Sequence, residues 1–408
     1  MKNKTIRMSR FWGAVLLIAG TTIGAGMLAL PVATAFTGFF PSLALFLICW
    51  LLMLASAFCF LDVNLFIKGE SNLISMAGQT LGRVGKAISW IIYLLLLYSL
   101  TAAYIAASAP LFAEAIAYLT GWRIPSWLAP FSLPFFFGSF IYMGTGGVDK
   151  INRLLMIGLL LAYALLVAFL PTHIQPPLLT HVDWPVGVIA ISVILTSFGY
   201  HIIIPSLTTY MEHDAKRLRR IILIGSAIPL LVYIVWQFLI LGIVPLRELS
   251  IAWQKGASAT DPLSRILPES WLTLSARFFS FFAIVTSFLG VALSLSDFLT
   301  DGLKIKKTWE GRLMALSLTF LPPLFFVFTY ERGFYLALQY AGAFVAILLG
   351  ILPAAMAWTL KTPPFYRSFK GRVLLIAIML LSLIVVIIDI LQETGCLAGL
   401  LQGYTRSS

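Results

Sequence analysis

Long apolar segments separated by short polar ones fill the chain from residue 11 to residue 391. An apolar segment of about 20 residues has the length that a helix needs to cross about 30 Å of hydrocarbon. The pattern therefore predicts an all-α protein embedded in a lipid bilayer, with eleven membrane-spanning helices bounded by turn-forming and charged residues. The predicted helices cover residues 11–36, 41–67, 87–118, 127–144, 152–171, 185–211, 220–244, 271–299, 312–329, 334–360 and 372–391.

The segments that join these helices are short. The longest, about 245–270, is polar with scattered Pro and Gly, and it is expected to be a loop. Neither an extended linker nor a low-complexity tract divides the chain. Residues 1–408 are therefore expected to form a single transmembrane domain.

The composition excludes an ordinary soluble protein. Hydrophobic residues make up 60% of the chain, charged residues make up 11%, and the mean hydropathy is +0.97; soluble proteins carry about 25% charged residues. The formal net charge of +12 comes from Lys and Arg in the short polar segments, without a basic helix that could bind nucleic acid. Most of these cations lie on the side of the N-terminus, so the positive-inside rule predicts a cytoplasmic N-terminus and, with eleven helices, a C-terminus on the other side.

Two of the predicted helices carry Gly and hydroxyl residues near their midpoints. Residues 20–31 read GTTIGAGMLALP, and residues 196–206 read TSFGYHIIIPS. Gly and Pro weaken a helix by about 1 and 3 kcal/mol, and backbone groups freed within a membrane must be buried in protein or face a wet cavity. The matching breaks predict a 5+5 inverted repeat, 11–171 and 185–360, around a central site, with 372–391 as an extra helix. Alternatively, the Gly20-x-x-x-Gly24 spacing only allows close helix packing.

A broken helix offers its free backbone groups to a small zwitterion. Free N–H groups at the start of the second half-helix attract an anion, and free carbonyls at the end of the first half-helix attract an ammonium group. An α-amino acid carries both charges. The carbonyls near 19–21 and 197–199 are expected to bind the ammonium group. The amides expected to bind the carboxylate are those of Thr21, Thr22, Ile23, Gly24, Ala25 and Gly26.

No pattern in the chain indicates an enzyme, a cofactor or a metal site. The three cysteines form no CxxC pair, the four histidines form no HExxH pattern, and no P-loop is present. A channel would need repeated polar residues along a pore, and the predicted helices lack them. These observations favour a secondary transporter.

Several longer motifs resemble those of one family. They are GTTIGAGMLALP (20–31), TSFGYHIIIPSL (196–207), GSAIPLLVYIVWQ (225–237) and TSFLGVALSLSDFLTDG (286–302). They are similar to motifs of the bacterial aromatic amino acid permeases, the tryptophan/tyrosine transporters of the amino acid–polyamine–cation superfamily, and most of all to those of the tyrosine-specific members. The resemblance implies a leucine-transporter-type fold in the first ten helices and proton symport of aromatic amino acids, above all tyrosine, across a bacterial inner membrane. The C-terminus would then be periplasmic.

The same fold resemblance implies a side-chain pocket lined by the first, third, sixth, eighth and tenth helices. Aromatic neighbours in such a pocket would favour offset or edge contacts with the substrate ring. Ordinary core packing is the alternative role for each aromatic residue. The candidates are Tyr98, Thr101, Ala102 and Tyr104 on the third helix, and Ser197, Phe198, Gly199, Tyr200 and His201 at the second break.

Ionisable residues inside spans are candidates for coupling transport to an ion gradient. His201 could carry a proton or hydrogen-bond the freed backbone at the second break. Asp297, near the cytoplasmic end of 271–299, could carry the proton or lie as a simple interfacial carboxylate. Sodium is the alternative ion, because related transporters bind it with hydroxyls of the eighth helix, and Ser294 lies in the comparable stretch. The carboxylates expected to be solvated near span ends are Asp62, Glu114 and Asp389.

Overall fold

The regular structure of the chain is helical throughout the part that the computed structural model describes, residues 2–67, 71–306, 308–330, 332–360, 364–401 and 404. Its α-helices are α1 (Lys2–Thr22), α2 (Gly26–Ala33), α3 (Phe39–Phe66), α4 (Leu73–Thr120), α5 (Ser132–Met143), α6 (Thr145–Phe169), α7 (Ile191–Ser197), α8 (Ile204–Tyr210), α9 (Ala215–Ile243), α10 (Leu246–Lys255), α11 (Thr260–Ile266), α12 (Ser270–Gly302), α13 (Trp309–Thr329), α14 (Gly333–Val345), α15 (Leu352–Thr359) and α16 (Phe369–Glu393).

Short 3-10 and π segments join some of these helices. The ones used below are the 3-10 segments η4 (Pro185–Ala190), η5 (His201–Ile203) and η7 (Pro364–Arg367) and the π-helical segment η6 (Ala346–Ile351).

Nine helical spans in the described residues are long and apolar enough to cross a membrane. Two of these spans combine shorter helices, Pro185–Tyr210 with α7 and α8 and Gly333–Thr359 with α14 and α15, and the bent pair α1–α2 would make a tenth. Their outer faces carry exposed apolar side chains such as Phe325, Leu161 and Ile384, and apolar surface of this extent is typical of a protein that contacts lipid. The prediction of a multi-pass membrane protein is thus confirmed. The predicted helix 127–144 corresponds to a shorter apolar helix, Ala129–Met143, on which the count of eleven depends.

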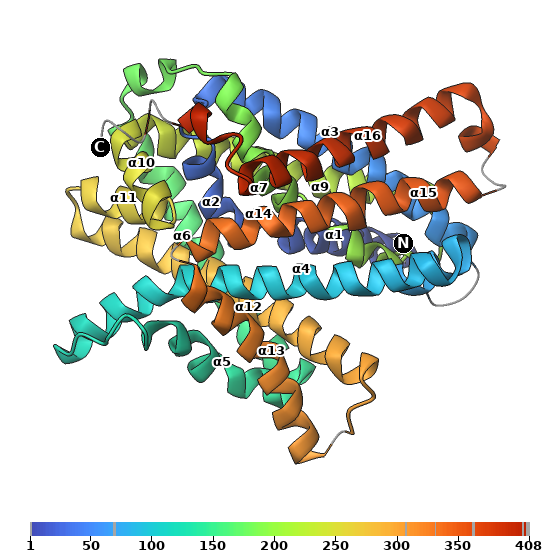
Figure 1. The fold of residues 1–408 in the computed structure, drawn as a ribbon, viewed down its shortest axis with the longest axis horizontal. Coiled ribbons are helices and arrows are strands. Elements are labelled where there is room, and N and C mark those ends of the chain that lie inside the picture. The colour runs from blue at the N-terminus through green and yellow to red at the C-terminus, as the bar shows by residue number, and fades with distance from the viewer. Residues whose placement is uncertain are drawn as a thin grey trace.

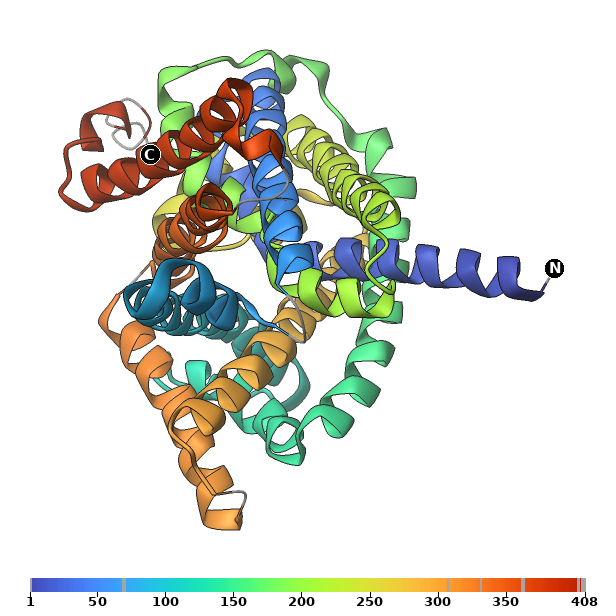
Figure 2. The same ribbon diagram turned by 90° about the vertical axis from the view of Figure 1, so that its right-hand side faces the viewer.

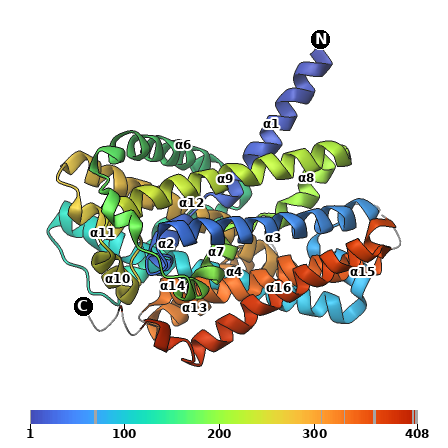
Figure 3. The same ribbon diagram turned by 90° about the horizontal axis from the view of Figure 1, so that it is seen from above.

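The helices form a bundle around two short half-helices. α3, α4, α15 and α16 run side by side along the long axis of the molecule (Figure 1). α2 and α7 lie near the middle, in contact with each other, and α9 and α14 pack against them. The N-terminal part of α1 projects out of the bundle (Figures 2 and 3).

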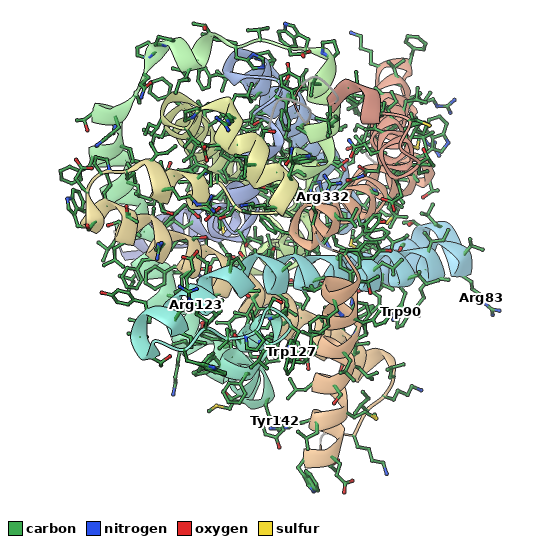
Figure 4. All side chains as sticks on the ribbon, turned by 60° about the vertical axis from the view of Figure 1, so that its left-hand side comes forward. Arg83, Trp90, Arg123, Trp127, Tyr142 and Arg332 are labelled. Carbon is green, nitrogen blue, oxygen red and sulfur yellow. The ribbon has the colours of Figure 1, made fainter. Side chains whose placement is uncertain are left out.

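Local sequence sets where several helices begin. The side chains of Asn72, Asp214, Thr308 and Ser368 each accept a hydrogen bond from the amide three residues later, at the starts of α4, α9, α13 and α16. Such caps satisfy amides that have no partner within the helix. Figure 4 shows charged side chains beyond both ends of the apolar part of α4, with Arg83 at one end and Arg123 at the other.

The prediction of a loop at 245–270 is wrong, because this segment forms α10 and α11. The sequence is polar overall, but α10 buries Leu249 and Trp253, and Gly256 ends it in the left-handed conformation at φ 65°. The backbone amide of Ala259 donates to the carbonyl of Leu28 on α2 at 3.0 Å. The two helices therefore cover one end of the central half-helices.

Two of the three carboxylates expected to be solvated are buried, which corrects that prediction. Asp62 is 8% exposed and accepts hydrogen bonds from Arg219 and Tyr366, each at 2.7 Å. Burial, together with the nearby Cys59 thiol and Asp62 carboxylate, raises the pKa of Tyr366, so its hydroxyl remains a donor. Asp389 is 4% exposed. Neighbouring helices cover both positions, and the linear sequence does not show this.

Glu114, the third of these carboxylates, is half exposed as expected. It forms an ion pair with Arg277 at 3.3 Å, and about half of each side chain remains accessible.

Candidate functional site

The first break separates α1 from α2 at residues 23–25, and the two helix axes differ by 53°. The amide of Ile23 still bonds the carbonyl of Ala19 at 2.8 Å, so α1 continues to this point. The amide of Ala25 instead donates to the Ser287 hydroxyl on α12 at 3.0 Å. The hydrogen bonds of the described residues include none from the amides of Gly24 or Gly26. These two amides are therefore free to bind an anion.

Thr21, Thr22 and Ile23 have a smaller role in the geometry than the sequence predicts. Thr21 and Thr22 belong to the last turn of α1, and their hydroxyls turn back to the carbonyls of Leu17 and Ile18. The amides of this turn donate to carbonyls within α1 and are not free for a ligand. The first break thus offers two amides rather than six.

The second break separates α7 from α8 at residues 198–203. The chain passes through Phe198, Gly199 and Tyr200 without regular helix and resumes through the short 3-10 segment η5. A Cβ at Gly199 would lie 3.2 Å from the carbonyl oxygen of Thr196, so the tight chain at this point favours glycine. This break interrupts the helix, but residues Pro185–Tyr210 still form one span.

Tyr233 on α9 joins the two breaks. Its hydroxyl lies 2.7 Å from the carbonyl oxygen of Thr22 and 2.9 Å from that of Ser197. These are the carbonyls at the ends of α1 and α7, where the half-helices stop. A carbonyl oxygen has two lone pairs, so each can accept a second bond from an ammonium group beside the tyrosine hydroxyl.

The two breaks also touch directly. A Cβ at Gly26 would lie 2.9 Å from the Ser197 hydroxyl oxygen, which is closer than real Cβ contacts. The absence of a side chain at Gly26 therefore lets α2 and the end of α7 approach each other. The free amides of the first break and the carbonyls of both breaks consequently lie in one small region.

Aromatic side chains surround this region. Phe198 and Tyr233 have ring centroids 5.4 Å apart. Tyr200 and His201 are fully buried with centroids 5.1 Å apart, and His201 also meets Phe60 at 6.2 Å. Neither ring nitrogen of His201 makes a hydrogen bond of regular geometry with the described atoms, and the backbone group near the ring is that of Met53 on α3. In this structure His201 therefore does not hold the freed backbone by either ring nitrogen.

Of the candidates on α4, Tyr104 lies at the breaks and Tyr98 does not. The Tyr104 hydroxyl lies next to the Ser287 hydroxyl, which binds the first break. Thr101 and Ala102 are buried on the same helix. Tyr98 points to α13, where its hydroxyl donates to the carbonyl of Leu318 at 2.9 Å.

The two candidates for ion coupling on α12 lie away from the breaks. The hydroxyl on α12 that contacts the first break is Ser287, and Ser294 is two turns, about 10 Å, further along the helix. Ser294 donates to the carbonyl of Gly290. Asp297 lines a different cavity, of about 190 Å³, together with Lys306 and others. The structure thus separates these positions from the region between the two breaks.

Two residues that build the site, Tyr233 and Ser287, are not among the candidates from the sequence. Both lie inside motifs noted above, 225–237 and 286–302. The sequence signal that could have identified them is a hydroxyl side chain at mid-membrane depth, on a helix that faces the breaks. Neither residue interrupts its own helix, so the search for breaks did not find them.

A cavity of about 380 Å³ lies beyond the site, beside α10 and α11, which stand at one end of the bundle in Figure 1. The Glu114–Arg277 ion pair lines it, and so does an Asp261–Arg265 pair at 2.7 Å. Nearby, Arg332 lies 5.9 Å over the Trp253 ring and is labelled in Figure 4. The cavity is therefore lined by paired charges of both signs.

The sequence matches a model of the tryptophan/tyrosine permease family over residues 7–389. Tyrosine-specific transport system 1 of Haemophilus influenzae is 34% identical over 404 residues, and the match covers 97% of this chain and 98% of the relative. The tryptophan-specific transport protein of Pseudomonas aeruginosa is 31% identical over 380 residues, covering 90% of this chain and 91% of the relative.

A solved structure has a similar architecture. The crystal structure of a histidine-to-alanine mutant of the Eremococcus coleocola manganese transporter superposes with a TM-score of 0.61 at 14% identity. The alignment covers 94% of this chain and 87% of that chain. At this level of identity the likeness shows a shared fold.

Proposed function

Because this chain belongs to the tryptophan/tyrosine permease family, we propose that it is a proton symporter that imports aromatic amino acids, with tyrosine as its preferred substrate. The observation that carries the proposal is the pair of broken helices whose terminal carbonyls share the Tyr233 hydroxyl. This arrangement offers free amides and carbonyls close together and needs no ionised side chain. An α-amino acid has the matching pair of charges.

In this proposal the substrate carboxylate binds the amides of Gly24 and Gly26, at the start of α2. The dipole of a helix favours an anion at this end. The ammonium group binds the carbonyls of Thr22 and Ser197. Ala25 holds the backbone in its broken form through its amide bond to Ser287, whereas Thr21 and Ile23 complete the end of α1.

The aromatic ring of the substrate lies against aromatic and small side chains. Tyr104 and Phe198 are close enough to the breaks to contact it, with Thr101, Ala102 and Gly199 leaving room. Offset and edge contacts between rings are worth about 0.5–1.5 kcal/mol each beyond the area that they bury. Tyr200 and His201 form the next layer, where a buried histidine can bond a substrate hydroxyl.

The proposed architecture has eleven spans in one domain, with Ala129–Met143 as the fourth. Residues 11–171 and 185–360 form the two inverted repeats, in which the breaks occupy corresponding helices. The N-terminus is cytoplasmic and the C-terminus periplasmic, because most of the Lys and Arg side chains lie on the N-terminal side. The membrane is the bacterial inner membrane, where a proton gradient is available.

The coupling ion in this proposal is the proton. One charge crossing about 150 mV supplies roughly 3.5 kcal/mol, and this is enough to accumulate substrate by between two and three decades. A sodium-coupled transporter of the same fold is the competing function. It would use the hydroxyls of α12, of which Ser287 lies at the break.

The test is uptake of labelled tyrosine into proteoliposomes that contain the purified full-length chain. A proton gradient is imposed in one run and a sodium gradient in another, and each run is competed with unlabelled tyrosine, tryptophan, phenylalanine and leucine. We expect the proton gradient to drive uptake of labelled tyrosine. Unlabelled aromatic amino acids should inhibit this uptake, and leucine should not. Uptake driven only by sodium would overturn the choice of ion. Inhibition by leucine as strong as by tyrosine would overturn the substrate class.

A further inference from the structure

A carboxyl group lies buried between the last helix and the first half of the second broken span. The Oδ1 atom of Asp389 on α16 accepts a hydrogen bond from the Ser192 hydroxyl on α7. Its Oδ2 atom has no hydrogen-bond partner among the described atoms. Ile387, Ile390 and Leu391 on the outer side of α16 are exposed and apolar, so at this level the helix still faces hydrocarbon.

No lysine or arginine lies on the elements packed beside this carboxyl group. The sequences of α7, η4, η6 and α15 contain no ionisable residue. α14 contributes Tyr335, whose hydroxyl donates to the carbonyl of Ala257, and Tyr340, which interacts with Glu393. Glu393 is exposed and lies one turn beyond Asp389 on α16.

The other ionisable groups on elements that contact α16 belong to α3 and η7. Among these groups, the Tyr366 hydroxyl donates a hydrogen bond to the Asp62 carboxylate near the opposite end of α16. The cations at the start of α16 are some 17 residues, about 25 Å, from Asp389 along the helix. The full set comprises Cys49, Cys59, Asp62, Tyr366 and Arg367, with Lys370 and Arg372 on α16 itself.

A buried carboxylate without a cation is strongly disfavoured, because desolvation of the charge is not offset. In the conformation described here Asp389 therefore holds a proton, and one oxygen is left over that no protein group uses. An ionisable group inside a membrane bundle is a candidate for an ion or proton path. Asp389 is such a group, and none of the substrate-binding interactions uses it.

We propose that Asp389 carries the coupled proton and that Ser192 links its protonation to the position of α7. This inference rests on the proposed proton symport. The carboxylate takes one proton from the side of higher proton concentration and releases the same proton to the other side, so no further reactant is needed.

The link to the substrate runs through a single half-helix. Ser192 lies five residues before Ser197, whose carbonyl is part of the proposed ammonium site. The protonated carboxyl group fits the closed contact between α16 and α7. Once it ionises, it requires water or new donors, so α7 and α16 must separate. Movement of α7 then carries the substrate-binding carbonyl with it.

The first experiment compares wild type with Asp389→Asn in proteoliposomes, measuring tyrosine accumulation under an imposed pH gradient and tyrosine counterflow at equal pH. We expect counterflow to continue in the variant, because the amide is neutral like the protonated acid. Accumulation above equilibrium is expected to be lost, and the rate is expected to become independent of pH. Glu393→Gln, one turn away on the same helix, is the matched control and should accumulate tyrosine as wild type does.

Two results separate this inference from the proposed function. If wild type itself shows no accumulation under a pH gradient, the proposed symport is wrong, and the inference is wrong with it. If wild type is proton-driven and Asp389→Asn accumulates tyrosine with the same pH profile, the symport stands and the inference is overturned. Recovery of pH-dependent accumulation by Asp389→Glu would support a titrating role rather than a structural one.

A measurement on the wild-type protein does not depend on folding of a variant. Dicyclohexylcarbodiimide reacts with protonated carboxyl groups in apolar surroundings, and mass spectrometry locates the modified residue. We expect modification at Asp389 that increases as the pH falls and that abolishes proton-driven accumulation while counterflow persists. Modification confined to other carboxyl groups, with Asp389 unreacted at low pH, would contradict the proposal.

Discussion

At the scale of single residues, the space around a glycine decides what it can tolerate. A Cβ at Gly24 would collide with the Ser287 hydroxyl, which binds the amide of Ala25. A Cβ at Gly13, which lies earlier in the chain within α1, would meet its nearest neighbour at an ordinary 3.9 Å. The two positions therefore separate the effect of the first break from the general effect of adding a methyl group to α1.

We predict that Gly24→Ala displaces Ser287 and distorts the proposed carboxylate site. The tyrosine concentration for half-maximal uptake should increase at least about tenfold, which corresponds to ~1.4 kcal/mol. Initial rates of uptake in proteoliposomes give this concentration, and Gly13→Ala is the control expected to match wild type. An unchanged half-saturation value in a folded Gly24→Ala variant would exclude the first break from the site.

Tyr233 offers a second prediction at this scale. Tyr233→Phe removes the hydroxyl that holds the carbonyls of Thr22 and Ser197, and the net value of a hydrogen bond is about 0.5–1.5 kcal/mol. We expect tyrosine affinity to fall roughly threefold to tenfold in equilibrium binding. The control is Tyr163→Phe, because that hydroxyl also donates to a carbonyl on α9, at Val232, and not to the end of a half-helix. Equal affinity losses in both variants would show that Tyr233 acts only through general stability.

Much of the backbone part of the site could be predicted from single residues in the sequence. Gly24 and Gly26 interrupt a hydrophobic helix, and this signal is local. Tyr233 and Ser287 could not be predicted in the same way, because their roles depend on which faces of α9 and α12 meet the breaks. Tyr98 fits the pattern as well as Tyr104 does, and only the packing of α4 against α13 separates the two.

At the scale of elements, the contact between α14 and α7 holds the second break in place. A Cβ at Gly342 would lie 2.5 Å from the backbone oxygen of Ser192, so the two helices approach with no room for a side chain. Close approach through small residues is the usual way in which helices associate within membranes. The half-helix α7 is short and depends on such neighbours for its position.

We predict that Gly342→Ala forces α14 and α7 apart and destabilises the protein by about 1–3 kcal/mol, the usual cost of overpacking a core. Thermal unfolding in detergent measures the loss. Gly146→Ala on α6 is the control, because a Cβ there would meet nothing within 4 Å. A Gly342→Ala variant as stable as the control would mean that the helices separate at little cost.

Elements were predictable where the signal is a long apolar run or a break within one. The segment 245–270 was not, because α10 and α11 are short and bury only one face. α10 packs against α2 and Tyr335 of α14, and α11 packs against α12. The extra helical stretch before Gly82 in α4 was missed for a related reason. Gly82 has a φ of 72° and joins two helical stretches at a kink. In the sequence alone, a glycine at such a position indicates the end of a helix.

At the scale of the whole molecule, the distribution of Lys and Arg predicts a periplasmic C-terminus. Cys396, just after α16, is exposed, whereas Cys49 and Cys59 are buried. We expect a membrane-impermeant maleimide to label the wild-type protein in right-side-out vesicles, and Cys396→Ser to abolish the labelling. Labelling only after the vesicles are opened would place the C-terminus in the cytoplasm and would reverse the orientation.

The class of the molecule and its family followed from the sequence, and the family match confirms the resemblance. The burial of Asp62 and Asp389 did not follow, because a carboxylate near the end of a span is solvated or covered according to its neighbours. Arg219 and Tyr366 cover the first, and α7 covers the second. Long-range packing of this kind is the part of the structure that hydropathy does not contain.

The central claim is that the two breaks bind both charges of an aromatic amino acid. The most direct measurement is equilibrium binding of labelled tyrosine to the purified protein, competed with tyramine, which lacks the carboxylate, and with 3-(4-hydroxyphenyl)propionate, which lacks the ammonium group. The account predicts that unlabelled tyrosine displaces the label and that neither analogue competes at similar concentration. Displacement by either analogue as effective as by tyrosine would contradict it, because one of the two backbone sites would then be unused.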